Sequence, residues 1–140
     1  MGSREGGEAE GESIYTDPTE AKRFVEQTGI NALACAFGTA HGIYLKEPKL
    51  DFPRLEKIAS LVDVPLVMHG GSGVSDEDYC TAISNGIRKI NYYSYMSKAG
   101  VTAVKTMLQE DVTFFHDLAL AAQKAMEENV TKAMLVFACK

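Results

Sequence analysis

The chain has 140 residues, a formal net charge of −5, 46% hydrophobic residues and 24% charged residues. This length and composition suit one soluble domain with a packed core and exclude a disordered chain. Acidic residues outnumber basic ones by 19 to 14, which argues against a nucleic-acid partner, because binding to phosphate backbones calls for clustered lysine and arginine.

Residues 1–15 are rich in glycine and glutamate. A signal peptide would instead be basic and then apolar, and no stretch of the chain approaches the length of a membrane span. We therefore expect 1–15 to be an acidic, Gly-rich loop segment, residues 16–140 to be the folded part, and no membrane partner. The cysteines Cys35, Cys80 and Cys139 are odd in number and lack CxxC spacing, which favours the reducing cytoplasm.

The segment from Asp17 to Glu20 has the residues of a helix start, with a capping Asp followed by Pro18. It predicts a helix to about Thr28, which Gly29 ends. The continuous apolar run at 32–37 is typical of a strand buried on both faces of a parallel sheet. Asp51 then caps a second predicted helix with apolar residues at helical spacing up to Val62, and residues 64–68 form the next apolar strand.

Ser75 with Asp78 predicts a third helix, which Asn85 and Gly86 end, and residues 87–91 form a third short strand. Helical patterns follow at 96–108, 114–128 and 131–138. Alternating helices and strands indicate an α/β fold with a parallel sheet and right-handed crossovers. Three strands cannot close an eight-stranded barrel, so we expect the C-terminal half of a TIM (β/α)8 barrel.

Two histidines occupy equivalent places, because His41 and His69 each follow an apolar strand and precede a glycine. The carboxyl ends of barrel strands converge on one face, so the two imidazoles could meet at one metal ion. The alternative for His41 is a histidine at the end of a helix or sheet that bonds to the backbone. His116 lies within a helical pattern and is expected to be structural or on the surface.

The loop from Gly70 to Gly73 lies between a buried strand and a helix. It offers backbone N–H groups, the Ser72 hydroxyl and the positive end of a helix dipole, which together suit a phosphate. The alternative is a plain flexible turn.

Asn91, at the end of the third strand, could hydrogen-bond a hydroxyl or enolate oxygen, and Ser94 could donate to a phosphate. An aromatic packing layer is the alternative for the segment and the better interpretation of Tyr92. Arg88 and Lys89 can be read as solvated strand-end charges, and Glu8 and Glu10 as solvated charge.

These motifs resemble the class II, zinc-dependent fructose-bisphosphate/tagatose-bisphosphate aldolases, over the C-terminal half of a family member. The resemblance is carried by Thr16-Asp17-Pro18, GTAHG at 38–42, Pro48 to Phe52, HGGSG at 69–73 and Lys89-Ile90-Asn91. It implies that His41 and His69 bind zinc. It places Gly42, Gly70, Gly71 and Ser72 around the ketose phosphate and, in some members, a monovalent cation. It also implies that Asn91 contacts the dihydroxyacetone unit and that Ser94 replaces a phosphate-binding Thr.

The resemblance also likens residues 6–11 to a mobile acidic loop, with Glu8 assisting proton transfer, whereas Ala9 stands where many members carry a second acid. Tyr93 departs from the small or acidic residue often found at its position. The family's catalytic Asp and third zinc His would lie upstream, so we expect this chain to be a fragment.

The implied activity is reversible cleavage of fructose 1,6-bisphosphate or tagatose 1,6-bisphosphate to dihydroxyacetone phosphate and glyceraldehyde 3-phosphate. A phosphorylated ketose and further copies of the chain, in a homo-oligomer, are the expected partners. The alternative is a non-catalytic phosphosugar-binding or assembly half-barrel module.

Overall fold

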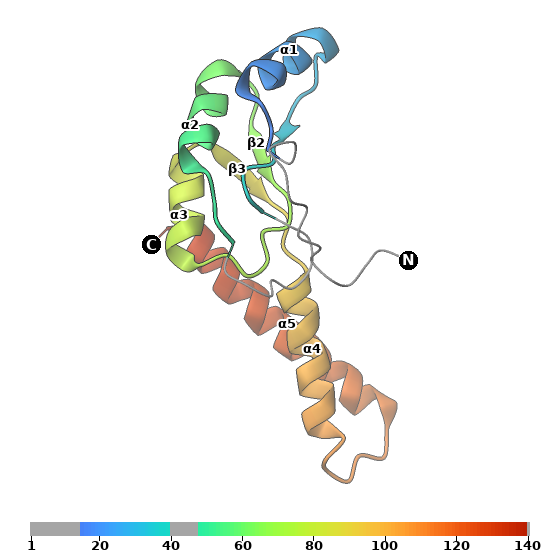
Figure 1. The fold of residues 1–140 in the computed structure, drawn as a ribbon. Helices are drawn as coiled ribbons and strands as arrows, with labels where there is room; N and C mark the ends of the chain where they lie inside the picture. The colour runs from blue at the N-terminus through green and yellow to red at the C-terminus, as the bar shows by residue number, and fades with distance from the viewer. Residues whose placement is uncertain (1–14, 40–47, 140) are drawn as a thin grey trace. The chain divides into compact units, whose positions relative to one another are not determined.

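The computed structural model describes residues 15–39 and 48–139. They belong to two compact units, the first ending at Tyr92 and the second beginning at Tyr93 (Figure 1). The first unit contains a parallel sheet with its helices, and the second contains two helices. This is the α/β arrangement expected from the sequence.

The three helices of the first unit are α1 (Pro18–Thr28), α2 (Phe52–Leu61) and α3 (Asp76–Ser84). Each begins after a residue whose side chain accepts hydrogen bonds from the first turn. Asp17 accepts from the N–H groups of Thr19 and Glu20, Asp51 from that of Arg54, and Ser75 from that of Asp78. These caps satisfy backbone donors that have no partner within the helix, which explains why the sequence predicts the starts well.

The strands are β1 (Leu33–Ala34), β2 (Leu66–Met68) and β3 (Ile87–Ile90), all parallel, with β2 in the centre. The strand β1 is shorter than the predicted 32–37, although the Cys35 N–H just beyond it still donates to the Val67 carbonyl at 3.4 Å, and Ala36 bonds on the opposite edge. The Ala36 N–H donates to the Thr16 hydroxyl at 2.8 Å, and the Thr16 N–H donates to the Ala36 carbonyl at 2.9 Å. The segment before α1 therefore lies along the continuation of β1.

An extra residue in β3 changes which side chains share a face of the sheet. Leu66 is opposite Ile87, whereas the next residue, Val67, is opposite Lys89, so Arg88 has no partner of its own in this pairing. This is a β-bulge, which shifts the alternation of side chains by one position. As a result Ile87 and Ile90, three residues apart, both face the same way as Leu66 and Met68.

The buried core lies between this face of the sheet and the helices, and Figure 1 shows α2 and α3 on the same side of the sheet. A Cβ on Gly86 would meet the Ala59 Cβ of α2 at 2.7 Å and Leu66 Cδ1 at 3.7 Å, so Leu66 faces α2. Burying one such large apolar side chain stabilises the fold by about 1.5–3 kcal/mol. The fully buried large side chains of the described residues are Phe37, Leu55, Ile58, Leu66, Met68 and Ile87.

Arg54 connects the start of α2 to the segment that precedes α1. Its Nε lies 2.9 Å from Asp51 Oδ2, its Nη1 donates to the Thr16 carbonyl at 3.3 Å, and its guanidinium lies 5.2 Å from the centre of the Tyr15 ring. The Arg54 hydrogen bonds, first from the side chain and then from the backbone N–H, lower the pKa of Asp51. The Arg54 side chain thus joins the segment around Thr16 to the segment around Asp51.

The second unit consists of α4 (Ser94–Met107) and α5 (Phe115–Phe137), which pack against each other. The sequence pattern predicts separate helical stretches at 114–128 and 131–138, but the structure has one continuous helix. Nothing between residues 128 and 131 is a glycine or proline, so no residue there interrupts the backbone hydrogen bonds. Among the described residues no helix combines the length and apolar character needed to cross a membrane.

Candidate functional site

The site forms where β2 and β3 end. Met68 is opposite Ile90 on the helix-covered face of the sheet, so the next residues, His69 and Asn91, both fall on the other face. The Asn91 Nδ2 lies 2.9 Å from His69 Nδ1 and 3.2 Å from His69 Nε2. The sequence places both residues at strand ends, and the register of the sheet brings their side chains into contact.

Lys89 lies on the same face of the sheet as His69 and Asn91, although its sequence context suggests a solvated charge. It lies two residues before Asn91 on the same face, and its Nζ donates to Asn91 Oδ1. With its oxygen so engaged, the amide directs its N–H groups toward His69, so the ring nitrogen that accepts carries no proton. The spacing of Lys89 and Asn91 in a strand was the available signal for this contact.

His69 is a suitable ligand for zinc, because zinc binds the unprotonated nitrogen of a neutral imidazole. A bound metal ion would take the place of the Asn91 hydrogen bond at that nitrogen. Within 15–39 and 48–139 no three His, Cys, Asp or Glu side chains form a group that could hold a metal ion. A zinc site that included His69 would therefore need further ligands from outside these ranges.

The loop Gly70–Gly73 follows His69 and is held tightly at Gly71. The Gly71 N–H donates to the Asn91 carbonyl at 3.3 Å, and a Cβ at this position would meet Ile90 Cγ2 at 2.7 Å. Only glycine fits that space without displacing the end of β3. Gly70, with φ of 65°, lies in the left-handed region that glycine adopts without cost. The glycines are thus required by the backbone path.

The interior of this loop is polar but buried. The Ser72 residue is 4% exposed, and the hydroxyl of buried Tyr79 donates to the Gly71 carbonyl. The start of α3 is less favourable for a phosphate than the sequence predicts. Its first turn carries three acidic residues, Asp76, Glu77 and Asp78. Three carboxylates offset the positive end of the helix dipole, so binding of an anion would depend on the loop N–H groups more than on α3.

The other predicted site residues are placed as follows. Ser94 is the first residue of α4, in the second unit. Glu8, His41 and Gly42 lie outside the described residues. On either side of the segment that contains His41, the chain comes together a few residues beyond the end of β1. The Asp51 N–H donates to the Phe37 carbonyl at 2.7 Å, and a Cβ on Gly38 would lie 2.3 Å from the Lys49 carbonyl oxygen.

His116 and Cys35 have surroundings that are typical of structural residues. His116 is on α5, where its Nε2 lies 3.4 Å from Asp117 Oδ1 and its ring stacks on Phe114. Cys35 is buried, and burial raises the pKa of its thiol to about 11. A thiol with this pKa is protonated at neutral pH and is a poor nucleophile or metal ligand.

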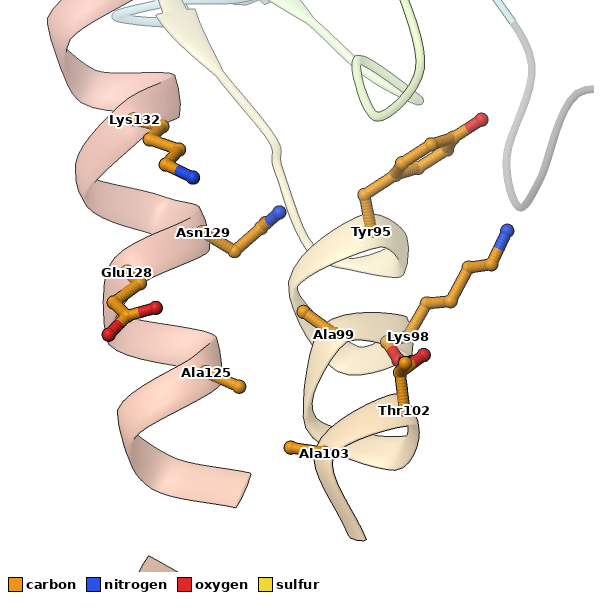
Figure 2. Close-up of a pocket in the computed structure, with 9 residues that line it drawn as sticks. All are labelled: Tyr95, Lys98, Ala99, Thr102, Ala103, Ala125, Glu128, Asn129 and Lys132. Atoms are coloured by element: carbon orange, nitrogen blue, oxygen red, sulfur yellow. Dashed lines mark hydrogen bonds between the residues drawn. The ribbon is translucent and has the colours of Figure 1, made fainter. Parts of the chain in front are cut away.

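Hollows in the surface occur in both units. Figure 2 shows a hollow in the second unit, between α4 and α5, with a volume of about 480 Å³. It combines small side chains such as Ala99 and Ala125 with the charged Lys98, Glu128 and Lys132. A hollow of about 560 Å³ in the first unit is lined by residues before β2 and β3, including Pro65 and Gly86. It therefore lies at the opposite ends of these strands from His69 and Asn91.

Comparison with known proteins places these features in a family. The family model of class II fructose-bisphosphate aldolase matches residues 1–140. Among curated proteins, the uncharacterized protein YdjI of Escherichia coli K12 is 44% identical over 123 residues, which is 88% of this chain and 43% of YdjI. The chain thus spans less than half the length of this relative.

Solved structures agree with this match. The crystal structure of the YdjI aldolase from E. coli K12 has a TM-score of 0.80 and 43% identity, over 88% of this chain and 46% of that one. A structure from Coccidioides immitis, provisionally described as a fructose-1,6-bisphosphate aldolase, has a TM-score of 0.75 and 32% identity, over 89% and 43%.

The fructose-bisphosphate aldolase of Campylobacter jejuni shares the fold, with a TM-score of 0.72 at 19% identity, over 91% of this chain and 46% of that one. Its likeness extends the fold match to a distant sequence. The three parallel strands and their helices are therefore part of a TIM-barrel fold, and the chain belongs to the class II fructose-bisphosphate aldolase family.

Proposed function

We propose that this chain supplies the ketose-phosphate site and part of the zinc site of a class II ketose-bisphosphate aldolase. The reaction is reversible, zinc-dependent cleavage of fructose 1,6-bisphosphate or tagatose 1,6-bisphosphate to dihydroxyacetone phosphate and glyceraldehyde 3-phosphate. The observation that carries the proposal is the contact between His69 and Asn91, beside a glycine loop whose backbone is fixed by Asn91 itself.

His41 is the second proposed zinc ligand, and chain length supports this. Gly38 follows the end of β1 by four residues, and β1 is the neighbour of β2 in the sheet. Two residues separate Gly38 from His41, and three steps along the chain can span at most about 10 Å, whereas adjacent strands lie about 4.8 Å apart. An imidazole at position 41 is therefore within reach of a metal ion bound by His69.

Each residue at this site has a proposed role in handling the substrate. Zinc, when bound, would polarise the ketone of the sugar. The Asn91 amide, whose orientation Lys89 fixes, would hydrogen-bond the dihydroxyacetone unit. The backbone N–H groups of the Gly70–Gly73 loop and the Ser72 and Ser94 hydroxyls would hold the phosphate. Glu8 would assist proton transfer, alongside a catalytic aspartate supplied by another part of the barrel.

An activity assay tests the proposal. The 140-residue chain alone should release no glyceraldehyde 3-phosphate from fructose or tagatose 1,6-bisphosphate, whereas the chain joined to an N-terminal half-barrel should do so in the presence of zinc. The base that moves the proton would belong to that half. Robust zinc-dependent cleavage by the chain alone would mean that the base is misplaced. An inactive complete barrel would favour the phosphosugar-binding or assembly module instead.

Zinc content provides a separate test of the ligands. His41→Ala combined with His69→Ala should lower the zinc retained after dialysis, because each substitution removes an imidazole donor. His116→Ala is the matched control, since His116 is an exposed histidine on α5 and should not contribute. Equal zinc in the double variant and in the control would show that the paired-ligand assignment is wrong.

A further inference from the structure

The side chain of Tyr79 suggests a role for α3 in shaping the glycine loop. Tyr79 is 4% exposed and its hydroxyl donates to the Gly71 carbonyl. It is the fourth residue of α3, and side chains on a helix point back toward its N-terminus. A long phenol at this position therefore reaches the loop that leads into the helix.

This hydrogen bond fixes a peptide plane. Because the peptide bond is planar and trans, the Gly71 carbonyl and the Ser72 N–H point in opposite directions. With the carbonyl held toward Tyr79, the Ser72 N–H is directed away from Tyr79. The Gly71 N–H is held by the Asn91 carbonyl at 3.3 Å. Both backbone groups of Gly71 are thus fixed, one by α3 and one by the end of β3.

We propose that Tyr79 is a positioning residue that orients the Gly71–Ser72 peptide so that the Ser72 N–H can donate to the phosphate of the ketose. The inference rests on the proposed phosphate role of the Gly70–Gly73 loop. It adds a residue that does not touch the substrate but decides where one donor points. Preorganised N–H groups bind an anion better than groups that must first rotate, because no ordering cost is paid on binding.

The test is a titration of the full chain with inorganic phosphate, followed through the backbone amide signals of Gly71, Ser72 and Gly73. In the parent chain the Ser72 amide should shift on binding. Tyr79→Phe removes only the hydroxyl and keeps the ring in the core. It should weaken phosphate binding about five- to tenfold, the effect of losing one well-placed hydrogen bond, and reduce the Ser72 shift most.

Tyr15→Phe is the matched control, because the Tyr15 ring lies against Arg54 at the start of α2. It should leave phosphate affinity unchanged. Amide hydrogen exchange without phosphate gives a second measurement, in which Tyr79→Phe should speed exchange at Ser72 more than at residues of α2.

The outcomes separate the two proposals. Suppose that the parent chain binds phosphate and that the phosphate affinity of Tyr79→Phe equals that of the parent or is no weaker than that of Tyr15→Phe. This result would overturn the role of Tyr79 and leave the proposed function intact. A parent chain whose Ser72 amide ignores phosphate would overturn the phosphate role of the loop, and the positioning role with it.

Discussion

Asp51 links the stability of the first unit to pH. Its pKa is lowered in the fold, mainly by the Arg54 side chain. A carboxyl whose folded pKa lies below its unfolded value, about 3.9, stabilises the fold above that value. This contribution is lost as the pH falls through the folded pKa.

Asp51→Asn isolates this charge, because asparagine is an equally good N-cap. The variant should be less stable than the parent at pH 6, and the difference should shrink by pH 3, as measured by urea unfolding at both values. In an Arg54→Gln background the same substitution should matter less. A stability difference that is constant with pH would contradict the role of the ion pair.

Cys35 and Cys139 should differ in reactivity toward a thiol reagent. Cys35 is 4% exposed with a pKa of about 11, and Cys139 is exposed. Because the thiolate is the reactive form, iodoacetamide at about pH 8 should modify Cys139 in the native protein and leave Cys35 intact. Mass spectrometry of the peptides measures this, and denaturant should abolish the protection. Equal native rates at both positions would contradict the burial of Cys35.

Gly71→Ala should damage both stability and the site. The added Cβ meets Ile90 Cγ2 at 2.7 Å and the Asn91 carbonyl at 3.3 Å, and relieving such overpacking costs about 1–3 kcal/mol. The His69 and Asn91 side-chain NMR signals should therefore move. Gly29→Ala is the control, because a Cβ there meets nothing within 4 Å. It strains the backbone at a φ of 64° but should leave those signals unchanged.

At the scale of elements, the packing of α4 on α5 depends on a glycine within a helix. Gly100 is buried, and a Cβ there would lie 3.0 Å from both Cγ and Sδ of Met126. Replacing glycine in a helix gains up to about 1 kcal/mol of helix propensity, and a methyl group asks only for a small movement of a flexible methionine. Gly100→Ala should therefore change stability little.

Gly100→Leu should instead lower the free energy of unfolding by about 1–3 kcal/mol, because a branched side chain cannot fit between the helices. Combining it with Met126→Ala should recover part of the loss, and thermal unfolding of the four proteins of the double-mutant cycle measures this coupling. Additive effects would show that the two residues do not share the interface.

The elements themselves were largely predictable, since capping residues and apolar runs are local signals. Asp17, Asp51 and Ser75 begin the helices where the sequence predicts them. The differences come from long-range pairing. The segment after β1 is held at its outer edge by Thr16, which pairs with Ala36 from twenty residues away. α5 continues through residues 129–130, which lie between the two helical stretches that the sequence predicts at 114–128 and 131–138.

At the scale of the whole molecule, we expect the isolated chain to self-associate. In the described part of the sheet, β2 is paired on both sides, whereas β1 and β3 each pair with β2 alone. The second unit also exposes large apolar side chains, among them Phe115 at 81% and Met134 at 64%. Uncovered strand edges and apolar surface favour association. Sedimentation velocity should show dimers or larger species, and a stable monodisperse monomer would contradict this expectation.

The candidate site was predictable in position but not in geometry. That His69 and Asn91 end parallel strands follows from the apolar runs before them, and parallel strands end at one edge of a sheet. That their side chains touch depends on the shifted register at Leu66 and Val67, which no local pattern reveals. The contribution of Lys89 depends on the same register. The placement of His41 and Glu8 stays a prediction.

The bulge in β3 has a consequence for how this segment tolerates sequence change. The Arg88 side chain is exposed, and its Nη1 donates to the Ile83 and Ile87 carbonyls at 2.8 and 2.9 Å, so substitutions at position 88 cost little more than these contacts. Deleting Arg88 would remove the bulge and leave Ile90 opposite Met68, so Asn91 would stay on the face of His69. Pairing the full-length strand without a bulge would instead place Ile90 opposite His69 and turn Asn91 to the face that holds Met68. Position 88 should therefore tolerate both replacement and removal of its residue, because the pairing of Ile90 with Met68 keeps Asn91 beside His69 in either case.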